Sequence, residues 1–194
     1  MILDLIKKTR THRSYEDKKV SKEDILKILE GARLSSAGAN KQILRYAIVT
    51  DNNLCDEIFK LSHWATQIEW KPTLEESPRS YIIILTEKNL NFPNKFLYTD
   101  IGIASQNMRL MAFELGYETA LIDAPENGSI EKILGLDDGY KAHFSLAIGD
   151  ATDNIILTTA VNGDMKYTRV KSPDGKYTHY VPKLSIDEIV VLEN

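Results

Sequence analysis

Five apolar residues stand in a row from Tyr81 to Leu85, and no other feature of the chain restricts its fold as strongly. A half-buried strand alternates apolar and polar side chains, because successive residues point to opposite faces of the sheet. A strand without such alternation is typical of a sheet that is covered on both faces. The run is far shorter than the roughly 20 residues of a membrane span. We therefore predict an interior strand here and no membrane-spanning segment.

The apolar spacing elsewhere predicts helices that bury one face. Ser21 begins a sequence that resembles a capping box, and a helix is predicted over about residues 22–34. The longest helix is predicted from Asp100 to Leu115, with Thr99 as its cap. A shorter amphipathic stretch over residues 2–8 also predicts a helix.

Further strands are predicted at Leu44–Thr50, Thr119–Ile122 and Ala142–Ile148, which are rich in strand-forming residues. The tail from Asn154 onward has no long helix, and Ile189–Leu192 is strand-like. No internal repeat and no linker divides the chain, so we expect one domain over residues 1–194.

A basic cluster lies near the start of a chain whose formal net charge is −4. It contains Arg10 and Arg13, with the hydroxyl residues Thr11 and Ser14 beside them. An arginine fork matches phosphate oxygens, and a nearby hydroxyl can complete such a site. The alternative is the solvated end of a helix, where the helix dipole favours cations. The cluster by itself leaves both interpretations open.

Composition and charge exclude several classes of function. Cys55 is the only cysteine, which excludes a disulfide framework and a cysteine-based metal cluster within one chain. The net negative charge argues against nucleic-acid binding. The first residues lack the order of a signal peptide, so we expect a cytoplasmic location. The histidines have no spacing typical of a metal site, and we expect each to be structural or exposed. They are His12, His63, His143 and His179.

Four motifs in this order resemble those of the nitroreductase family of FMN-dependent oxidoreductases. Residues 10–15 match R-[ST]-x-R-x-[FY], and residues 32–42 match most of A-R-x-x-P-S-x-x-N-x-Q. Residues 100–106 match D-x-G-x-x-x-Q within the long helix. The segments 164–167 and 181–183 look like the tail of one bacterial branch. The resemblance covers nearly the whole chain.

This resemblance implies an α+β fold with a central mixed, mainly antiparallel sheet flanked by helices in three layers, and with an extended C-terminal segment. It implies a homodimer with the flavin at the subunit interface. Residues 154–194 would then form a C-terminal arm that contacts the partner subunit. The implied reaction passes hydride from NADH or NADPH through flavin N5 to a small electron-poor acceptor, such as a nitroaromatic or a quinone. No catalytic side chain is predicted, because the flavin carries the chemistry.

The resemblance also assigns cofactor contacts. Arg10 suits the FMN phosphate, with Thr11 as a hydroxyl donor, and Arg13 is placed near the ring, where a cation stabilises the reduced flavin. Asn40 and Gln42 offer amide groups to the polar ring edge, although Asn40 can also be a turn residue. The other expected contacts are in the same loop, where the family's Pro-Ser pair is replaced. They are Ser36, Ala37 and Gly38.

Candidates for completing the site come from two other regions. Lys166, Arg169 or Lys183 of the tail is expected to close the phosphate site. Trp64 and Trp70, in an irregular stretch, are interpreted either as a lid over the acceptor or as ordinary packing or partner contacts. Two alternatives to this reductase remain. One is a flavin enzyme of other reductive chemistry, such as dehalogenation, and the other is a non-catalytic FMN-binding store or sensor.

Overall fold

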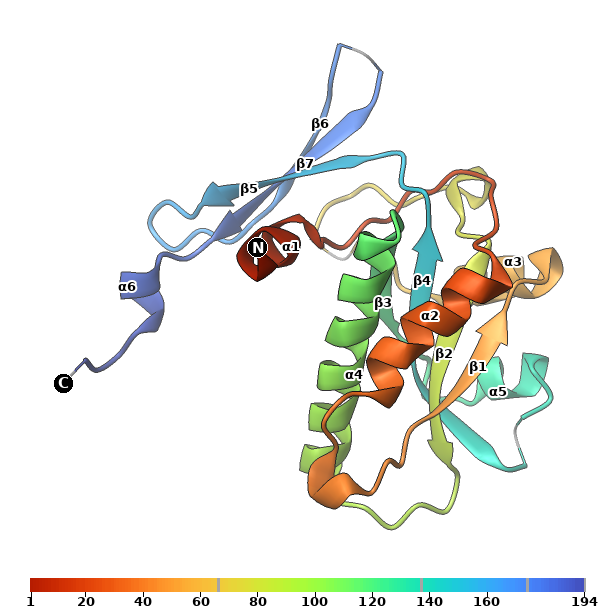
Figure 1. The fold of residues 1–194 in the computed structure, drawn as a ribbon. Coiled ribbons are helices and arrows are strands. Elements are labelled where there is room, and N and C mark those ends of the chain that lie inside the picture. Colours follow the sequence, from red (N-terminus) through yellow and green to blue (C-terminus); the bar gives the residue numbers. More distant parts are fainter. Residues whose placement is uncertain (66, 137, 174, 194) are drawn as a thin grey trace.

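A four-stranded sheet forms the centre of the body in the computed structural model, which describes residues 1–65, 67–136, 138–173 and 175–193 (Figure 1). All neighbouring strands run antiparallel. From edge to edge they are β1 (Arg45–Val49), β2 (Ser80–Glu87), β4 (Tyr140–Gly149) and β3 (Glu118–Asp123). A parallel bridge from Thr11 to Thr119 adds the N-terminal segment beside β3. The sheet is therefore mixed but mainly antiparallel, as predicted.

Strand β2 is buried on both of its faces. The side chains of Tyr81, Ile83 and Leu85 belong to one hydrophobic cluster. The side chains of Ile82 and Ile84 belong to a second cluster across the sheet. This confirms the interior strand that the unbroken apolar run predicted.

Two helices cover one face of the sheet, α2 (Lys22–Arg33) and α4 (Asn94–Glu114). The Ser21 hydroxyl accepts a hydrogen bond from the backbone N–H of Asp24 (3.0 Å), so the predicted cap of α2 is confirmed. Helix α4 begins earlier than predicted. Its first backbone hydrogen bonds end on the carbonyl of Pro93, and Thr99 lies inside the helix rather than at its cap.

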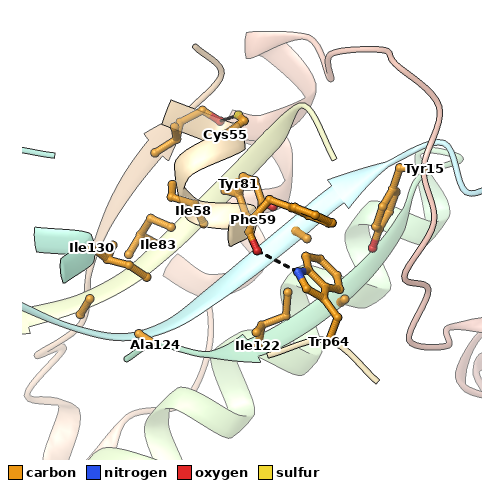
Figure 2. Packing of buried hydrophobic residues seen from close by; sticks show 14 of the residues in the cluster. Tyr15, Cys55, Ile58, Phe59, Trp64, Tyr81, Ile83, Ile122, Ala124 and Ile130 are labelled. Atoms are coloured by element: carbon orange, nitrogen blue, oxygen red, sulfur yellow. Dashed lines mark hydrogen bonds between the residues drawn. The ribbon is translucent and has the colours of Figure 1, made fainter. Parts of the chain in front are cut away.

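Two shorter helices cover the other face, α3 (Asn52–Leu61) and α5 (Ser129–Ile133). Figure 2 shows their cluster, in which Tyr81 and Ile83 of the sheet meet Ile58 of α3 and Ile130 of α5. Helices, sheet and helices thus form three layers, which confirms the predicted fold class.

A second, three-stranded sheet forms an arm that extends from the body beside α1 (Ile2–Lys8) (Figure 1). It contains β5 (Asn154–Thr159), β7 (Tyr177–Lys183) and β6 (Thr168–Lys171), in that order. Strands β5 and β7 are parallel, whereas β6 and β7 are antiparallel.

The strand predicted at Ile189–Leu192 is wrong. A short helix, α6 (Ile186–Ile189), which Ser185 and Glu188 cap at its start, ends at Ile189, and residues 190–192 are neither helix nor strand. The residues that follow are exposed and extend away from the arm (Figure 1). In the part of the chain that is described, no helix is long and apolar enough to cross a membrane.

Candidate functional site

A cationic cavity of about 270 Å³ lies between the N-terminal segment, helix α4 and the arm. Its wall includes Thr9, Arg10, Thr11, Arg13, Gln106, Arg109, Ile155, Tyr167, His179, Val181 and Lys183. Four of these side chains are Arg or Lys, and no carboxylate is among them. Arg10, Thr11 and Arg13, which the sequence predicted as cofactor contacts, all line this cavity.

Arg10 is fixed by the end of helix α1. Its Nη2 donates a hydrogen bond to the carbonyl of Ile6 (2.5 Å), which the end of the helix leaves unpaired. Its Nε is buried and has no hydrogen-bond partner among the described residues. A buried donor without a partner costs free energy unless a ligand or water accepts its hydrogen. Arg10 therefore has donor capacity left for an anion.

Helix α4 contributes a further arginine to the wall. Nη2 of Arg109 donates to Oγ1 of Thr11 (3.1 Å), and its Nε donates to Oγ1 of Thr119 (3.2 Å). The Thr11 hydroxyl thus accepts from Arg109, and its own hydrogen is free for a ligand. This arrangement suits a hydroxyl that donates to a phosphate oxygen.

The cations of the cavity destabilise one another. Burial lowers the pKa of Arg10. Burial also lowers the pKa of Arg109, and the charge of Arg10 adds to this effect. Such shifts mean that the charged forms have lost hydration and lack a counter-ion. An anion in the cavity supplies that counter-ion, so the donor set fits a phosphate group.

Of the three tail candidates, the structure brings Lys183 to the cavity. Lys166 lies elsewhere, in an open hollow of the arm. The guanidinium of Arg169 is stacked between two rings, 3.9 Å from the centroid of Trp70 and 3.3 Å from that of Tyr177. Lys166 and Arg169 therefore do not line this cavity in the single chain, and their placement at the phosphate site stays a prediction.

The predicted loop contacts lie in a different place. Ser36, Ala37 and Gln42 line a second cavity of about 530 Å³ beside α2 and the first half of α4. The N–H of Gly38 donates to Oδ1 of Asp100 (2.8 Å), which fastens this loop to α4.

Asn40 lies in a stretch of left-handed backbone. Its φ is +53°, and the φ angles of Ala39 and Gln42 are +49° and +48°. Left-handed backbone at three non-glycine positions carries strain, so surrounding contacts must hold it. Nε2 of Gln42 donates to Oδ1 of Asn40 (3.1 Å), and both side chains are exposed.

The two cavities lie on opposite faces of α4. Asp100 lines one and Arg109 lines the other, and nine residues separate them. Nine residues of an α-helix correspond to about 900° of rotation and about 14 Å of rise. Figure 1 shows the loop between α2 and β1 at the end of α4 that is remote from α1. One chain therefore does not bring the two halves of the predicted site together.

The two tryptophans differ in their surroundings. Trp64 is buried, its ring centroid lies 5.1 Å from that of Phe59, and its Nε1 donates to the Phe59 carbonyl (3.1 Å; Figure 2). Trp64 therefore packs in the core, as one of its two interpretations predicted. Its interpretation as a lid is wrong, because the indole is buried. Trp70 lies against Arg169 and His179 of the arm.

The profile of the Nitroreductase family matches residues 6–150, from the basic cluster to the end of β4. The chain belongs to the nitroreductase family. This finding confirms the resemblance that the four motifs carried. The match spans three quarters of the chain and includes every strand of the central sheet.

Curated relatives of this nitroreductase-family chain are distant. A Methanothermobacter thermautotrophicus protein with the provisional name NADH dehydrogenase/NAD(P)H nitroreductase is 27% identical over 115 residues. That match covers 59% of this chain and 56% of the relative, so the chain spans little more than half of its length. An iodotyrosine deiodinase of Thermotoga neapolitana is 24% identical over 172 residues, which cover 79% of this chain and 90% of the relative.

Solved structures share the fold at low identity. A provisionally named nitroreductase of Desulfovibrio desulfuricans, in complex with FMN, has a TM-score of 0.71 and is 20% identical, covering 100% of this chain and 96% of its own. An FMN-dependent nitroreductase of Clostridium difficile has a TM-score of 0.65 and is 22% identical. The match covers 83% of this chain and 92% of the nitroreductase chain.

Several residues of the cavity were missed by sequence reasoning. Arg109 carried a signal, since it is the one basic residue between Asp100 and Leu115. His12 and His179 were expected to be structural or exposed; both are buried and contact the carboxylate of Asp153, and His179 also lines the cavity. No spacing reveals this contact, because 141 residues separate His12 from Asp153.

Proposed function

We propose that this nitroreductase-family protein is an FMN-dependent oxidoreductase that passes hydride from NADH or NADPH to a small electron-poor acceptor. The observation that carries the proposal is the cavity in which Arg10, Arg13, Arg109 and Lys183 meet the hydroxyl of Thr11. When bound, FMN supplies the hydride chemistry at N5 of its ring. The protein supplies binding, orientation and charge.

The residues of the cavity have separable tasks in this proposal. Arg10, Arg109 and Lys183 balance the phosphate, and Thr11 donates a hydrogen bond to it. Arg13 lies with its guanidinium 5.6 Å from the ring centroid of Tyr167, at the side of the cavity that the arm forms. A cation at the ring stabilises the reduced cofactor more than the oxidised one. No side chain has to act as a nucleophile.

The separation of the two cavities supports a homodimer. A ligand in the cavity of Arg10 and Arg109 cannot also touch the loop at Gly38 of the same chain, because α4 lies between them. A twofold axis presents the same patch of each subunit to the other, so the loop of one chain can meet the cavity of its partner. In this arrangement residues 154–194 form an arm at the subunit boundary.

The shared site is tested by mixing two variants that each lack one half. Arg10→Ala and Asn40→Ala are each expected to retain little FMN. Subunit exchange between them restores about a quarter of all sites, because half of the dimers are mixed and each mixed dimer has one intact site. Retained FMN is measured after gel filtration. No recovery, with exchange verified by mass spectrometry, contradicts a site built from two subunits.

Colour and anaerobic reduction test the function itself. The purified protein should bind FMN, and NADH or NADPH should then bleach the visible flavin band within seconds in the absence of oxygen. A protein that stays colourless after incubation with FMN contradicts the proposal. A protein that binds FMN but is bleached by neither nucleotide is better described as the non-catalytic store or sensor.

A second candidate function is reductive dehalogenation. It is favoured by the similarity to an iodotyrosine deiodinase that extends over 79% of this chain. The test supplies the chemically reduced, FMN-loaded protein with a halogenated phenol or a nitroaromatic and follows reoxidation of the flavin. Stoichiometric halide release supports dehalogenation. Reoxidation by the nitroaromatic alone supports the first proposal.

A further inference from the structure

Three buried titratable side chains join segments that are far apart in the sequence. Nδ1 of His12 lies 2.8 Å from Oδ1 of Asp153, and Nε2 of His179 lies 3.2 Å from Oδ2 of the same carboxylate. At most 10% of any of these side chains is exposed. One carboxylate thus faces two imidazoles where charges are poorly hydrated.

Asp153 stays charged within this cluster. Burial raises the pKa of its carboxyl group, but the hydrogen bond with His12 and the nearby imidazole of His179 outweigh burial and lower the pKa of Asp153 to about 2. The carboxylate is therefore negative throughout the physiological range. It can balance an additional proton on an imidazole beside it.

His179 also belongs to the wall of the cationic cavity. The residue is 2% exposed, and neither of its ring nitrogens makes an aligned hydrogen bond within the described residues. Buried nitrogens of this kind are normally satisfied by a ligand or water. Because Nε2 faces Asp153, Nδ1 is the nitrogen that remains for a ligand.

The other groups around His179 are cationic or aromatic. Arg169 is its register partner on β6, with a guanidinium that stacks on two aromatic rings. The ring centroid of Tyr167 lies 6.3 Å from that of the imidazole. The cavity adds the charges of Arg10, Arg13, Arg109 and Lys183. Among the described residues Asp153 is the carboxylate placed beside His179, so we take the further negative charge there to be that of a ligand.

We propose that His179 is an additional ligand-binding residue, which donates a charged hydrogen bond from Nδ1 to an oxygen of the phosphate. The carboxylate of Asp153 favours a proton on Nε2, so the neutral ring presents a lone pair at Nδ1, which repels a phosphate oxygen. Binding there requires a second proton on the ring. The inference rests on the proposed function in taking FMN as the ligand, and it adds that binding consumes a proton.

Calorimetric titration in buffers of different ionisation enthalpy measures this proton. At about pH 7.5 a phosphate monoester with a second pKa near 6 is almost fully dianionic, so proton uptake reports on the protein. We expect the wild type to take up protons when it binds FMN, because the proposed contact requires the doubly protonated ring. Riboflavin, which lacks the phosphate, should bind without uptake.

His179→Gln keeps a neutral donor of similar reach but cannot take up the proton. It should bind FMN about tenfold more weakly and without uptake, because a charged hydrogen bond is replaced by a neutral one. His63→Gln is the matched control, since His63 is exposed and outside the cavity, and it should behave as the wild type. The riboflavin comparison tests the proposal in the wild type if His179→Gln does not fold.

Several results overturn the inference. No uptake in the wild type, equal uptake with riboflavin, or undiminished uptake in His179→Gln each contradict a phosphate contact at His179. Uptake that occurs only on flavin reduction places the proton at the ring instead and contradicts it as well. Ribose 5-phosphate separates the two proposals. If FMN fails to bind, the proposed function is contradicted. Proton uptake on binding of ribose 5-phosphate, if it is lost in His179→Gln, still supports the phosphate contact.

Discussion

Nη2 of Arg109 donates a hydrogen bond to Oγ1 of Thr11 over 3.1 Å, although 98 residues separate them. The bond occupies an acceptor position of the threonine hydroxyl and leaves its hydrogen free for a ligand in the cavity. It also ties the middle of a core helix to the N-terminal segment. The orientation of the hydroxyl is therefore set by the body of the protein.

Thr11→Val tests this orientation, because it replaces the hydroxyl by a methyl group of similar size. Loss of one donor to a phosphate and of the acceptor for Arg109 should weaken FMN binding by about 1.5 to 3 kcal/mol, or roughly tenfold to a hundredfold. Thr11→Ser retains the hydroxyl and should bind FMN nearly as the wild type does. Fluorescence titration of FMN measures both. Equal affinities of the Val and Ser variants would show that the hydroxyl does not contact the ligand.

Arg13→Ala should mainly change the reduction potential of the bound flavin. Removing a cation near the reduced ring should lower the two-electron potential by about 30 mV, the equivalent of about 1.4 kcal/mol. The control is Arg10→Ala, which should weaken FMN retention and shift the potential less. Equilibrium reduction against a reference dye gives the potential. A wild-type potential in Arg13→Ala would place Arg13 away from the ring.

Asp153 should stabilise the fold in a manner that depends on pH. Its pKa is lowered from 3.8 to about 2, so its contribution is complete above pH 4 and is lost as the pH falls toward 2. A shift of this size corresponds to about 2 kcal/mol. Asp153→Asn should lose that amount at neutral pH and approach the wild type near pH 2. Urea unfolding at several pH values measures the difference, and a constant difference across this range would contradict it.

Gly31→Ala should destabilise the contact between α2 and α4. A Cβ at this position would lie 2.9 Å from Cγ of Met111 and 3.0 Å from the backbone carbonyl of Asn107. We expect a loss of about 1 to 3 kcal/mol from this overlap, despite the better helix propensity of alanine. Gly102→Ala is the control, because its Cβ meets nothing within 4 Å and should stabilise α4. Thermal unfolding distinguishes the two variants.

Cys55 should be unreactive in the folded protein. It is fully buried, and burial raises the pKa of its thiol to about 12, with a partial opposing effect of Arg79. The reactive thiolate is therefore a very small fraction at about pH 8. A thiol reagent should label Cys55 only as fast as the protein opens, and immediately in denaturant. Rapid labelling of the native protein would mean that α3 opens readily.

The sequence predicted the elements whose residues interact mainly with near neighbours in the chain. The apolar run at Tyr81 determined the position of β2, and Ser21 determined the start of α2. The start of α4 was missed because its first turns are partly exposed, with Phe96 at 44% and Tyr98 at 53%, and carry little of the apolar pattern. At the tail, residues 190–192 are exposed and belong to neither sheet, so their strand propensity alone does not form a strand.

The residues of the candidate site also fall into a group that the sequence predicted and a group that it missed. Arg10, Thr11 and Arg13 were predicted because one short motif contains them. Arg109, Asp153 and His179 were missed, since tertiary contacts alone bring them to that motif. The exact partner of a buried charge depends on how distant segments pack, which local propensity does not encode.

The wall of the cationic cavity joins residues 9–13 to Lys183, so one side of the cavity is synthesised well before the other. While β7 is still inside the ribosome, the strands of the central sheet have already been synthesised, yet the arm has no strand with which β5 or β6 can pair. Domains form largely as units during synthesis. The cavity is therefore complete only after β7 has been synthesised and has paired with β5 and β6.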